Sequence, residues 1–247
     1  MRLFTSVLLA CAVMTSAAAQ APEIPLGDTR LTVHTLLRED VFAGFLDNNM
    51  ERMARGERNI EVLLKDRPDQ RGNLLAWKAG IALHRAVRAN EAGNAADFAR
   101  YFKDAREGFA AAAAEPAGKD GVAAITGGTY AQFADRLPQE YRAAAWAQAY
   151  DAYTTLWKAQ QAQLEQMPSH FKGEVLAGMA QSAQRTGHAE ESAQFIDRML
   201  TMLAGTPFEK TARQWKDNPA SAATTSLTCK NCHAPGRLAA KIASLEK

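Results

Sequence analysis

Residues 138–168, PQEYRAAAWAQAYDAYTTLWKAQQAQLEQMP, form the longest stretch of this chain that lies between two prolines and contains no glycine. Apolar side chains recur along it at three- and four-residue steps, the spacing of one face of an amphipathic helix. These side chains are Tyr141, Ala145, Trp146, Ala149, Tyr153, Leu156 and Trp157. Because proline cannot continue a regular helix, the stretch predicts one long helix bounded by Pro138 and Pro168.

The segments on either side repeat this pattern of apolar helical faces separated by glycine and proline. The separating residues are Gly56, Pro68, Gly93, Pro116, Gly187, Gly205 and Pro207. Only the segment around Gly127 and Gly128 is expected to be less regular. The composition agrees, since the chain has 50 alanines but only 14 valines and isoleucines, an excess of helix-forming over strand-forming residues. We therefore predict an all-α protein whose body, residues 38–216, consists of about four stacked antiparallel helical hairpins.

Two stretches of this body resemble tetratricopeptide repeats. One is Ala76-Trp77-Lys78-Ala79-Gly80 with Ala92-Gly93, Phe98 and Pro116, and the other is Leu176-Ala177-Gly178 with Thr186-Gly187-His188, Phe195 and Pro207. The resemblance implies paired helices that stack to form a concave binding face. Successive closing prolines are 48, 52 and 39 residues apart, so the repeat is divergent. An ordinary irregular helical bundle is the alternative.

The first residues have the layout of an export signal. Arg2 precedes a short apolar run, and Ala17-Ala18-Ala19 supplies the small residues of a cleavage site. We predict a signal peptide over residues 1–19, a periplasmic location, and an extended lead-in over residues 20–37. An uncleaved amphipathic helix and a lipoprotein anchored at Cys11 are the alternatives.

Charge and hydropathy exclude two classes of partner. The chain has 29 basic and 27 acidic residues, and removal of the signal peptide would leave a charge of 28 − 27 = +1. A nearly neutral chain gives no electrostatic reason to expect nucleic acid binding. No later apolar segment approaches the length of a membrane span.

A short motif near the end of the chain carries the chemistry: Cys229-Lys230-Asn231-Cys232-His233. A C-x-x-C-H run is the attachment signature of c-type haem. The two thiols form thioether bonds to the haem, and the adjoining imidazole binds the iron. We therefore predict one covalent haem c held by Cys229 and Cys232, with His233 as the proximal iron ligand.

Three other chemistries use paired cysteines. A thioredoxin-like redox pair belongs to a βαβ fold, and this chain shows no strand alternation. A disulfide across two residues closes too short a loop to stabilise the fold much. A structural zinc site needs four ligands, and the motif offers at most three.

The position of the motif suggests a type of cytochrome. A C-terminal motif with lysine after the first cysteine resembles the class II cytochromes, the cytochrome c′ type. In that family a helix continues past the histidine, whereas Ala234-Pro235-Gly236 should interrupt it here, and this body is too long for a single four-helix bundle. The resemblance therefore implies only the attachment roles of Cys229 and Cys232 and the axial role of His233.

The segments around the motif complete the predicted organisation. Residues 217–228 are small and polar and are expected to form a linker. Residues 229–247 are expected to form the haem attachment segment and a terminal helix with Leu238, Ile242 and Leu245 on one side.

The sequence leaves the distal iron ligand open. The final hairpin lies nearest the motif along the chain, which makes its histidine and methionines the candidates. They are Met179, His188, Met199 and Met202. A five-coordinate iron with an open site is equally allowed, and the axial ligands largely decide between electron transfer and ligand binding.

The function expected from these features is transfer of single electrons to or from a partner protein. No nucleophile with an adjacent base and no paired carboxylates stand out, so we expect an electron carrier rather than a catalyst. The alternatives are a haem protein that binds or senses a gas, and a tetratricopeptide-type scaffold with a partly structural haem. A peroxidase is the weakest alternative.

Overall fold

The computed structural model describes residues 24–223 and 236–246, and every regular element in these ranges is a helix. The α-helices are α1 (Val33–Asp47), α2 (Met50–Asp66), α3 (Arg71–Glu91), α4 (Ala95–Ala114), α5 (Lys119–Phe133), α6 (Gln139–Gln160), α7 (Ser169–Arg185), α8 (Ala189–Met202), α9 (Pro207–Asp217) and α10 (Arg237–Leu245). The short 3₁₀ turns are η1 (Pro68–Gln70), η2 (Ala134–Arg136), η3 (Gln161–Gln166) and η4 (Pro219–Ala223). The all-α prediction is therefore confirmed.

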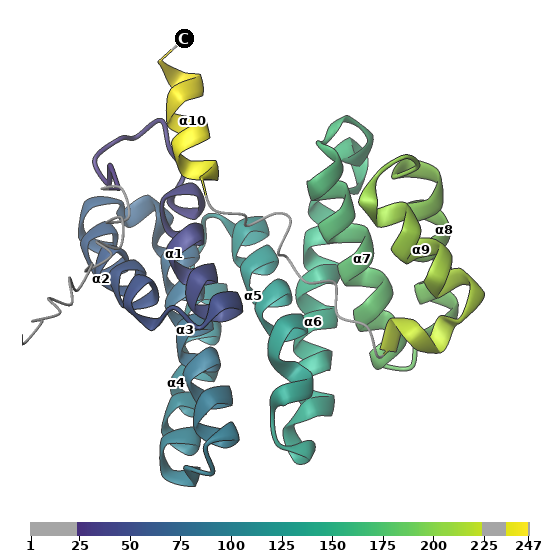
Figure 1. Cartoon of the computed structure of the whole chain (residues 1–247), viewed down its shortest axis with the longest axis horizontal. Helices are drawn as coiled ribbons and strands as arrows, with labels where there is room; N and C mark the ends of the chain where they lie inside the picture. The colour runs from purple at the N-terminus through teal and green to yellow at the C-terminus, as the bar shows by residue number, and fades with distance from the viewer. Residues whose placement is uncertain (1–23, 224–235, 247) are drawn as a thin grey trace, which may run out of the picture.

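The first eight α-helices pair as antiparallel hairpins: α1 with α2, α3 with α4, α5 with α6, and α7 with α8 (Figure 1). Two of the turns depend on glycines with left-handed backbones, Gly93 with φ 71° and Gly187 with φ 85°, a conformation that disfavours other residues. Asn94 then begins α4 by accepting a hydrogen bond from the Asp97 amide at 3.1 Å. The hairpins stand side by side in chain order, α9 packs on α8, and α10 packs on α1.

Helix α1 begins at Val33, so it includes the last five residues of the predicted extended lead-in. Thr32 caps the helix, because its hydroxyl accepts a hydrogen bond from the Thr35 amide at 3.2 Å. Leu36 and Leu37 then point into the core, where both are almost completely buried. Over residues 33–37 the predicted lead-in is therefore wrong, since capping and apolar burial favour helix.

The segment around Gly127 and Gly128 is a continuous helix, α5, rather than the less regular stretch expected. Gly127 lies against the ring of Tyr153 on α6, where a β-carbon would stand 3.1 Å from the ring. The glycine thus permits close helix packing here instead of breaking the helix. The predicted linker also differs, because Pro219–Ala223 form η4 against α7; residues 224–228 lie outside the described ranges.

Two hydrophobic cores share helix α6. The first core contains Ala145, Trp146 and Ala149 from the beginning of α6 and extends through α1–α5. The second contains Tyr153 and Leu156 from its later part and extends through α7–α9. Helix α6 therefore holds the two halves of the molecule in one arrangement.

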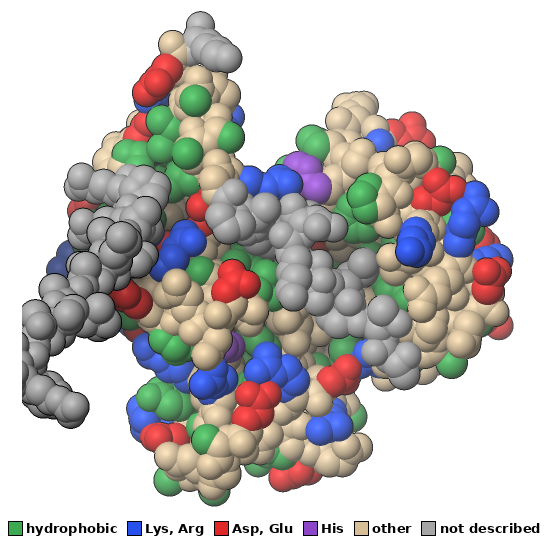
Figure 2. Space-filling model, in the orientation of Figure 1, with side chains coloured by type: hydrophobic (Ala, Val, Ile, Leu, Met, Phe, Trp, Pro, Cys, Tyr) green, Lys and Arg blue, Asp and Glu red, His purple; other side chains and the backbone are tan. Residues whose placement is uncertain are grey.

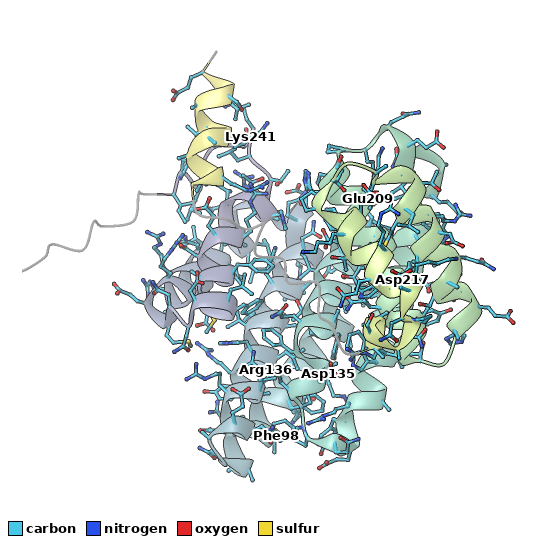
Figure 3. All side chains as sticks on the ribbon, turned by 45° about the vertical axis from the view of Figure 1, so that its right-hand side comes forward. Phe98, Asp135, Arg136, Glu209, Asp217 and Lys241 are labelled. Atoms are coloured by element: carbon cyan, nitrogen blue, oxygen red, sulfur yellow. The ribbon has the colours of Figure 1, made fainter. Side chains whose placement is uncertain are left out.

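Charged side chains of η2 also connect the two halves of the molecule that share α6. Arg136 forms an ion pair with Glu91 at the end of α3, at 2.8 Å. Its neighbour Asp135 accepts hydrogen bonds from the Trp146 indole at 2.8 Å and from Arg185 of α7 at 2.6 Å. Figure 3 shows Asp135 and Arg136 side by side at this junction.

Within the described ranges, no helix combines the length and the apolar character that crossing a bilayer requires.

The packing of Tyr153 predicts that two glycine-to-alanine substitutions change the stability of the fold in opposite directions. In Gly178→Ala the new methyl group would overlap the Tyr153 ring, and overpacking costs about 1–3 kcal/mol. Replacing a helical glycine by alanine returns only about 1 kcal/mol. We therefore expect a net loss of about 1–2 kcal/mol in the free energy of unfolding, measured by urea titration.

Gly128→Ala is the matched control. A β-carbon there would lie 3.7 Å from the Tyr153 hydroxyl and 3.8 Å from Glu174, which is ordinary contact. This variant should be more stable than the wild type by about 0.5–1 kcal/mol, the helix-propensity gain. A Gly178→Ala protein as stable as the wild type would contradict the packing interpretation.

Candidate functional site

The predicted haem attachment residues, Cys229, Cys232 and His233, lie outside the described residues, as does the predicted signal peptide. The structure does place the elements on both sides of the motif. Before it, η4 packs against α7; after it, α10 packs against α1. The Leu238 amide of α10 donates a 2.6 Å hydrogen bond to Glu39 of α1. The last described element before the motif therefore lies on the α7 side of the molecule, and the first described element after it lies on the α1 side.

The methionines proposed as distal ligands lie in or on the second core. Met179 and Met199 are completely buried there, and the Thr154 hydroxyl lies 4.0 Å from the sulfur of Met179. Met202 is half-buried against the same core. To bind iron, the sulfur of Met179 or Met199 would have to leave its present packing.

His188 lies at the turn between α7 and α8. Its ring stacks on Tyr150 at a centroid distance of 4.6 Å and an interplanar angle of 5°. Its Nδ1 lies 2.9 Å from the Thr186 hydroxyl. The imidazole is exposed, but it belongs to the α7–α8 turn and is not part of the second core that holds the three methionines.

A different pair of histidines lies beside α10. Burial, followed by the charges of Arg237 and Arg38, lowers the pKa of His170. Burial, followed by the charge of Arg38 and by His170, lowers the pKa of His34 to about 4. These charge effects indicate that Arg38 lies near both histidines and that Arg237 lies near His170. We call these four residues the junction cluster. Figure 2 shows basic side chains next to a histidine between the foot of α10 and the α7 side.

The junction cluster combines neutral imidazoles with cations. An imidazole with a lowered pKa is unprotonated at pH 7 and can bind a metal through nitrogen. The two guanidiniums keep their charge and can pair with carboxylates. The cluster can therefore bind an anionic metal complex, and sequence reasoning missed it because it joins residues from α1, α7 and α10.

Glu174 lies one helical turn after His170 on α7. It is half-buried near Gly128 and the Tyr153 hydroxyl, and burial raises its pKa to about 7. The i, i+4 spacing of His170 and Glu174, which places both on one face of α7, was the only sequence signal for this site.

His84, by contrast, belongs to the first core. It is 2% exposed and contacts the rings of Phe45 and Phe133 at 5.3 and 5.4 Å. Burial is the main cause that lowers its pKa to about 4. No group of three histidine, cysteine, aspartate or glutamate side chains among the described residues could hold a metal ion by itself.

The raised pKa of Glu174 generates a prediction about pH. A carboxyl with a pKa near 7 in the folded protein and 4.5 when unfolded stabilises the fold below pH 4.5, and this contribution is lost as the pH rises through 7. Glu174→Gln should therefore be more stable than the wild type by about 3 kcal/mol at pH 8, and equally stable at pH 4.

Urea unfolding at the two pH values measures this difference. Glu165→Gln is the control, because Glu165 is exposed on η3 and its replacement should leave the pH profile unchanged. Equal stability of Glu174→Gln and the wild type at both pH values would show that Glu174 ionises without a penalty.

The chain matches no protein-family model, and neither the curated proteins nor the solved structures include a match to it.

Proposed function

We propose that this protein is an exported mono-haem c-type cytochrome that transfers single electrons to or from a partner protein. The motif Cys229-Lys230-Asn231-Cys232-His233 is the observation that carries the proposal. The N-terminal residues are consistent with it, because attachment of this haem follows export and residues 1–19 have the layout of a signal peptide. When bound, the haem supplies an iron that cycles between ferric and ferrous states.

The residues around the motif suit this group. Cys229 and Cys232 would hold the haem by thioether bonds, and His233 would bind the iron. Haem also carries two propionate carboxylates, which fit the guanidiniums of Arg38 and Arg237 in the junction cluster. The thiols, the imidazole and the guanidiniums are therefore suitable groups to hold an anionic iron porphyrin.

The junction cluster also changes the order of the distal ligand candidates. Arg237 follows His233 by four residues, and a trans peptide chain of that length spans at most about 14 Å. His170 is close enough to Arg237 for its pKa to respond to that charge. We therefore place His170 first and His34 second, ahead of Met179, His188, Met199 and Met202.

Covalent attachment is tested by removing both thiols. The full chain, produced with a haem-attachment system, should stain for haem after denaturing electrophoresis. Cys229→Ala/Cys232→Ala should lose that stain and keep its helical circular dichroism, because α1–α9 pack against one another through their own side chains. Cys11→Ala is the control and should keep the stain. A haem stain retained by the double variant would refute the assignment.

The distal ligand is tested by optical spectroscopy of the ferric and ferrous protein. If His170 binds the iron, the wild type is low-spin, and His170→Ala becomes high-spin and binds carbon monoxide. Met179→Leu and Met199→Leu keep the volume of the second core while removing the thioether sulfur, so their spectra should match the wild type.

The same spectra separate the proposal from its alternatives. A low-spin wild type that does not respond to carbon monoxide supports electron transfer. A high-spin wild type that binds the gas readily would replace the proposal with gas binding. A spectral change in Met199→Leu without one in His170→Ala would assign the ligand to the second core.

A further inference from the structure

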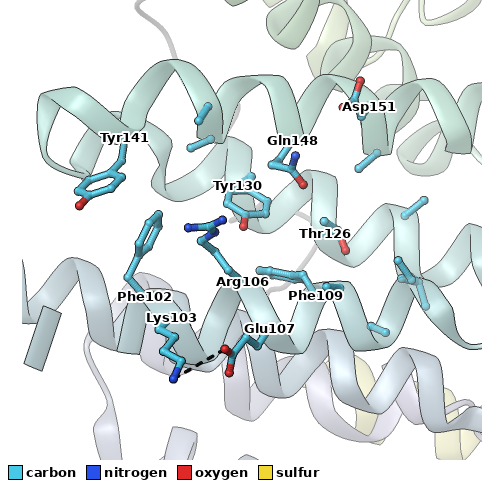
Figure 4. Close-up of a pocket in the computed structure, with 18 of the residues that line it drawn as sticks. Phe102, Lys103, Arg106, Glu107, Phe109, Thr126, Tyr130, Tyr141, Gln148 and Asp151 are labelled. Carbon is cyan, nitrogen blue, oxygen red and sulfur yellow. Dashed lines mark ion pairs between the residues drawn. The ribbon is translucent and has the colours of Figure 1, made fainter. Parts of the chain in front are cut away.

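A groove on another face of the molecule has no part in the proposed haem site. It lies between α4 and α6, because α3 packs closely on α5 while α4 makes far less contact with the same helix. Side chains from α4, α5 and α6 point into a space of about 1090 Å³ (Figure 4). This volume is in the range of pockets that bind small organic molecules.

The walls of the groove are mainly apolar. Phe109 and Val122 are both 5% exposed at its inner surface. One end is aromatic: the rings of Phe98 and Phe102 stack at 5.3 Å, and Phe102 contacts Tyr141 at 4.8 Å. A ligand in this space would place an apolar portion against these rings.

One cation in the groove lacks a counter-ion. Lys103 pairs with Glu107 of the same helix at 3.8 Å. Arg106 is exposed and points into the groove toward Tyr130 (Figure 4), and no described acidic side chain forms an ion pair with it. Its guanidinium can therefore bind an anion without first breaking a contact with a described carboxylate.

A tyrosine hydroxyl lies beside this cation. Tyr130 is 3% exposed, with its ring 5.0 Å from that of Phe109. Its hydroxyl points toward Arg106 (Figure 4) and forms no hydrogen bond with the described residues. Burial raises the pKa of Tyr130 to about 12 although the charge of Arg106 lowers it, so the hydroxyl stays protonated and can donate. The hydroxyl faces the groove and can donate a hydrogen bond to an acceptor that binds there.

We propose that this groove binds a monocarboxylate with an apolar tail, whose carboxylate accepts hydrogen bonds from Arg106 and Tyr130 and whose tail lies against Phe102 and Tyr141. From Arg106 to Phe98, α4 advances on the order of 12 Å, which suits a medium-length alkyl chain. Arg106 and Tyr130 converge on one point of a mainly apolar groove, as polar groups do in small-molecule sites. A docked protein helix would instead need contacts spread at three- and four-residue spacing.

Decanoate and decanol are the probes, titrated calorimetrically into the full chain. The wild type should bind one decanoate saturably and bind decanol more weakly. Arg106→Gln should weaken decanoate binding about ten- to thirtyfold, the usual effect of losing a charged hydrogen bond, and leave decanol unchanged. Tyr130→Phe keeps the ring and should weaken decanoate binding severalfold.

Lys103→Gln is the matched control, because it removes a cation of the same helix that already pairs with Glu107. It should leave decanoate affinity within about twofold of the wild type. Equal weakening by Lys103→Gln and Arg106→Gln would indicate general charge attraction and overturn the proposal. The absence of saturable decanoate binding by the wild type would overturn it as well.

Discussion

The ring of Tyr153 between two glycines is the contact on which the arrangement of this molecule depends. Gly127 of α5 lies on one side and Gly178 of α7 on the other; a β-carbon would overlap the ring at Gly178 and would stand only 3.1 Å from it at Gly127. The contact fixes the separation of α5, α6 and α7 where the two cores meet. It therefore also fixes the position of His170 and Glu174 on α7 relative to His34 and Arg38 on α1.

Much of the fold could be predicted from the sequence because its signals are local. Alanine content, apolar spacing and the turn glycines specify helices and their ends, and the long helix after Pro138 is α6. The error at α5 has a physical cause: Gly127 reads as a helix breaker unless its packing partner, Tyr153, is known. The helical spacing of Val33, Leu36 and Leu37 indicates the early start of α1. The two prolines in residues 20–37 favoured an extended segment instead, and that prediction was wrong here.

The candidate site likewise has one part that the sequence predicts and another that only the structure reveals. The haem motif is contiguous, so the sequence alone predicts it, and the expected chemistry rests on it. The junction cluster joins residues of α1, α7 and α10 that are far apart along the chain. Nearness in sequence therefore favoured Met179 and Met199, which the structure places inside the second core. The groove beside Arg106 and Tyr130 could not be predicted either, because it depends on which helices lie apart from each other, and no local sequence pattern specifies that.

The contact of α10 with α1 also sets an order for folding. The hydrogen bond from Leu238 to Glu39 joins residues 199 positions apart, and the ribosome delivers α1 first and α10 last. Most contacts in α1–α9 join neighbouring helices, so both cores can form as the chain emerges. With Leu238 as its only buried residue, α10 adds little to either core and can dock last.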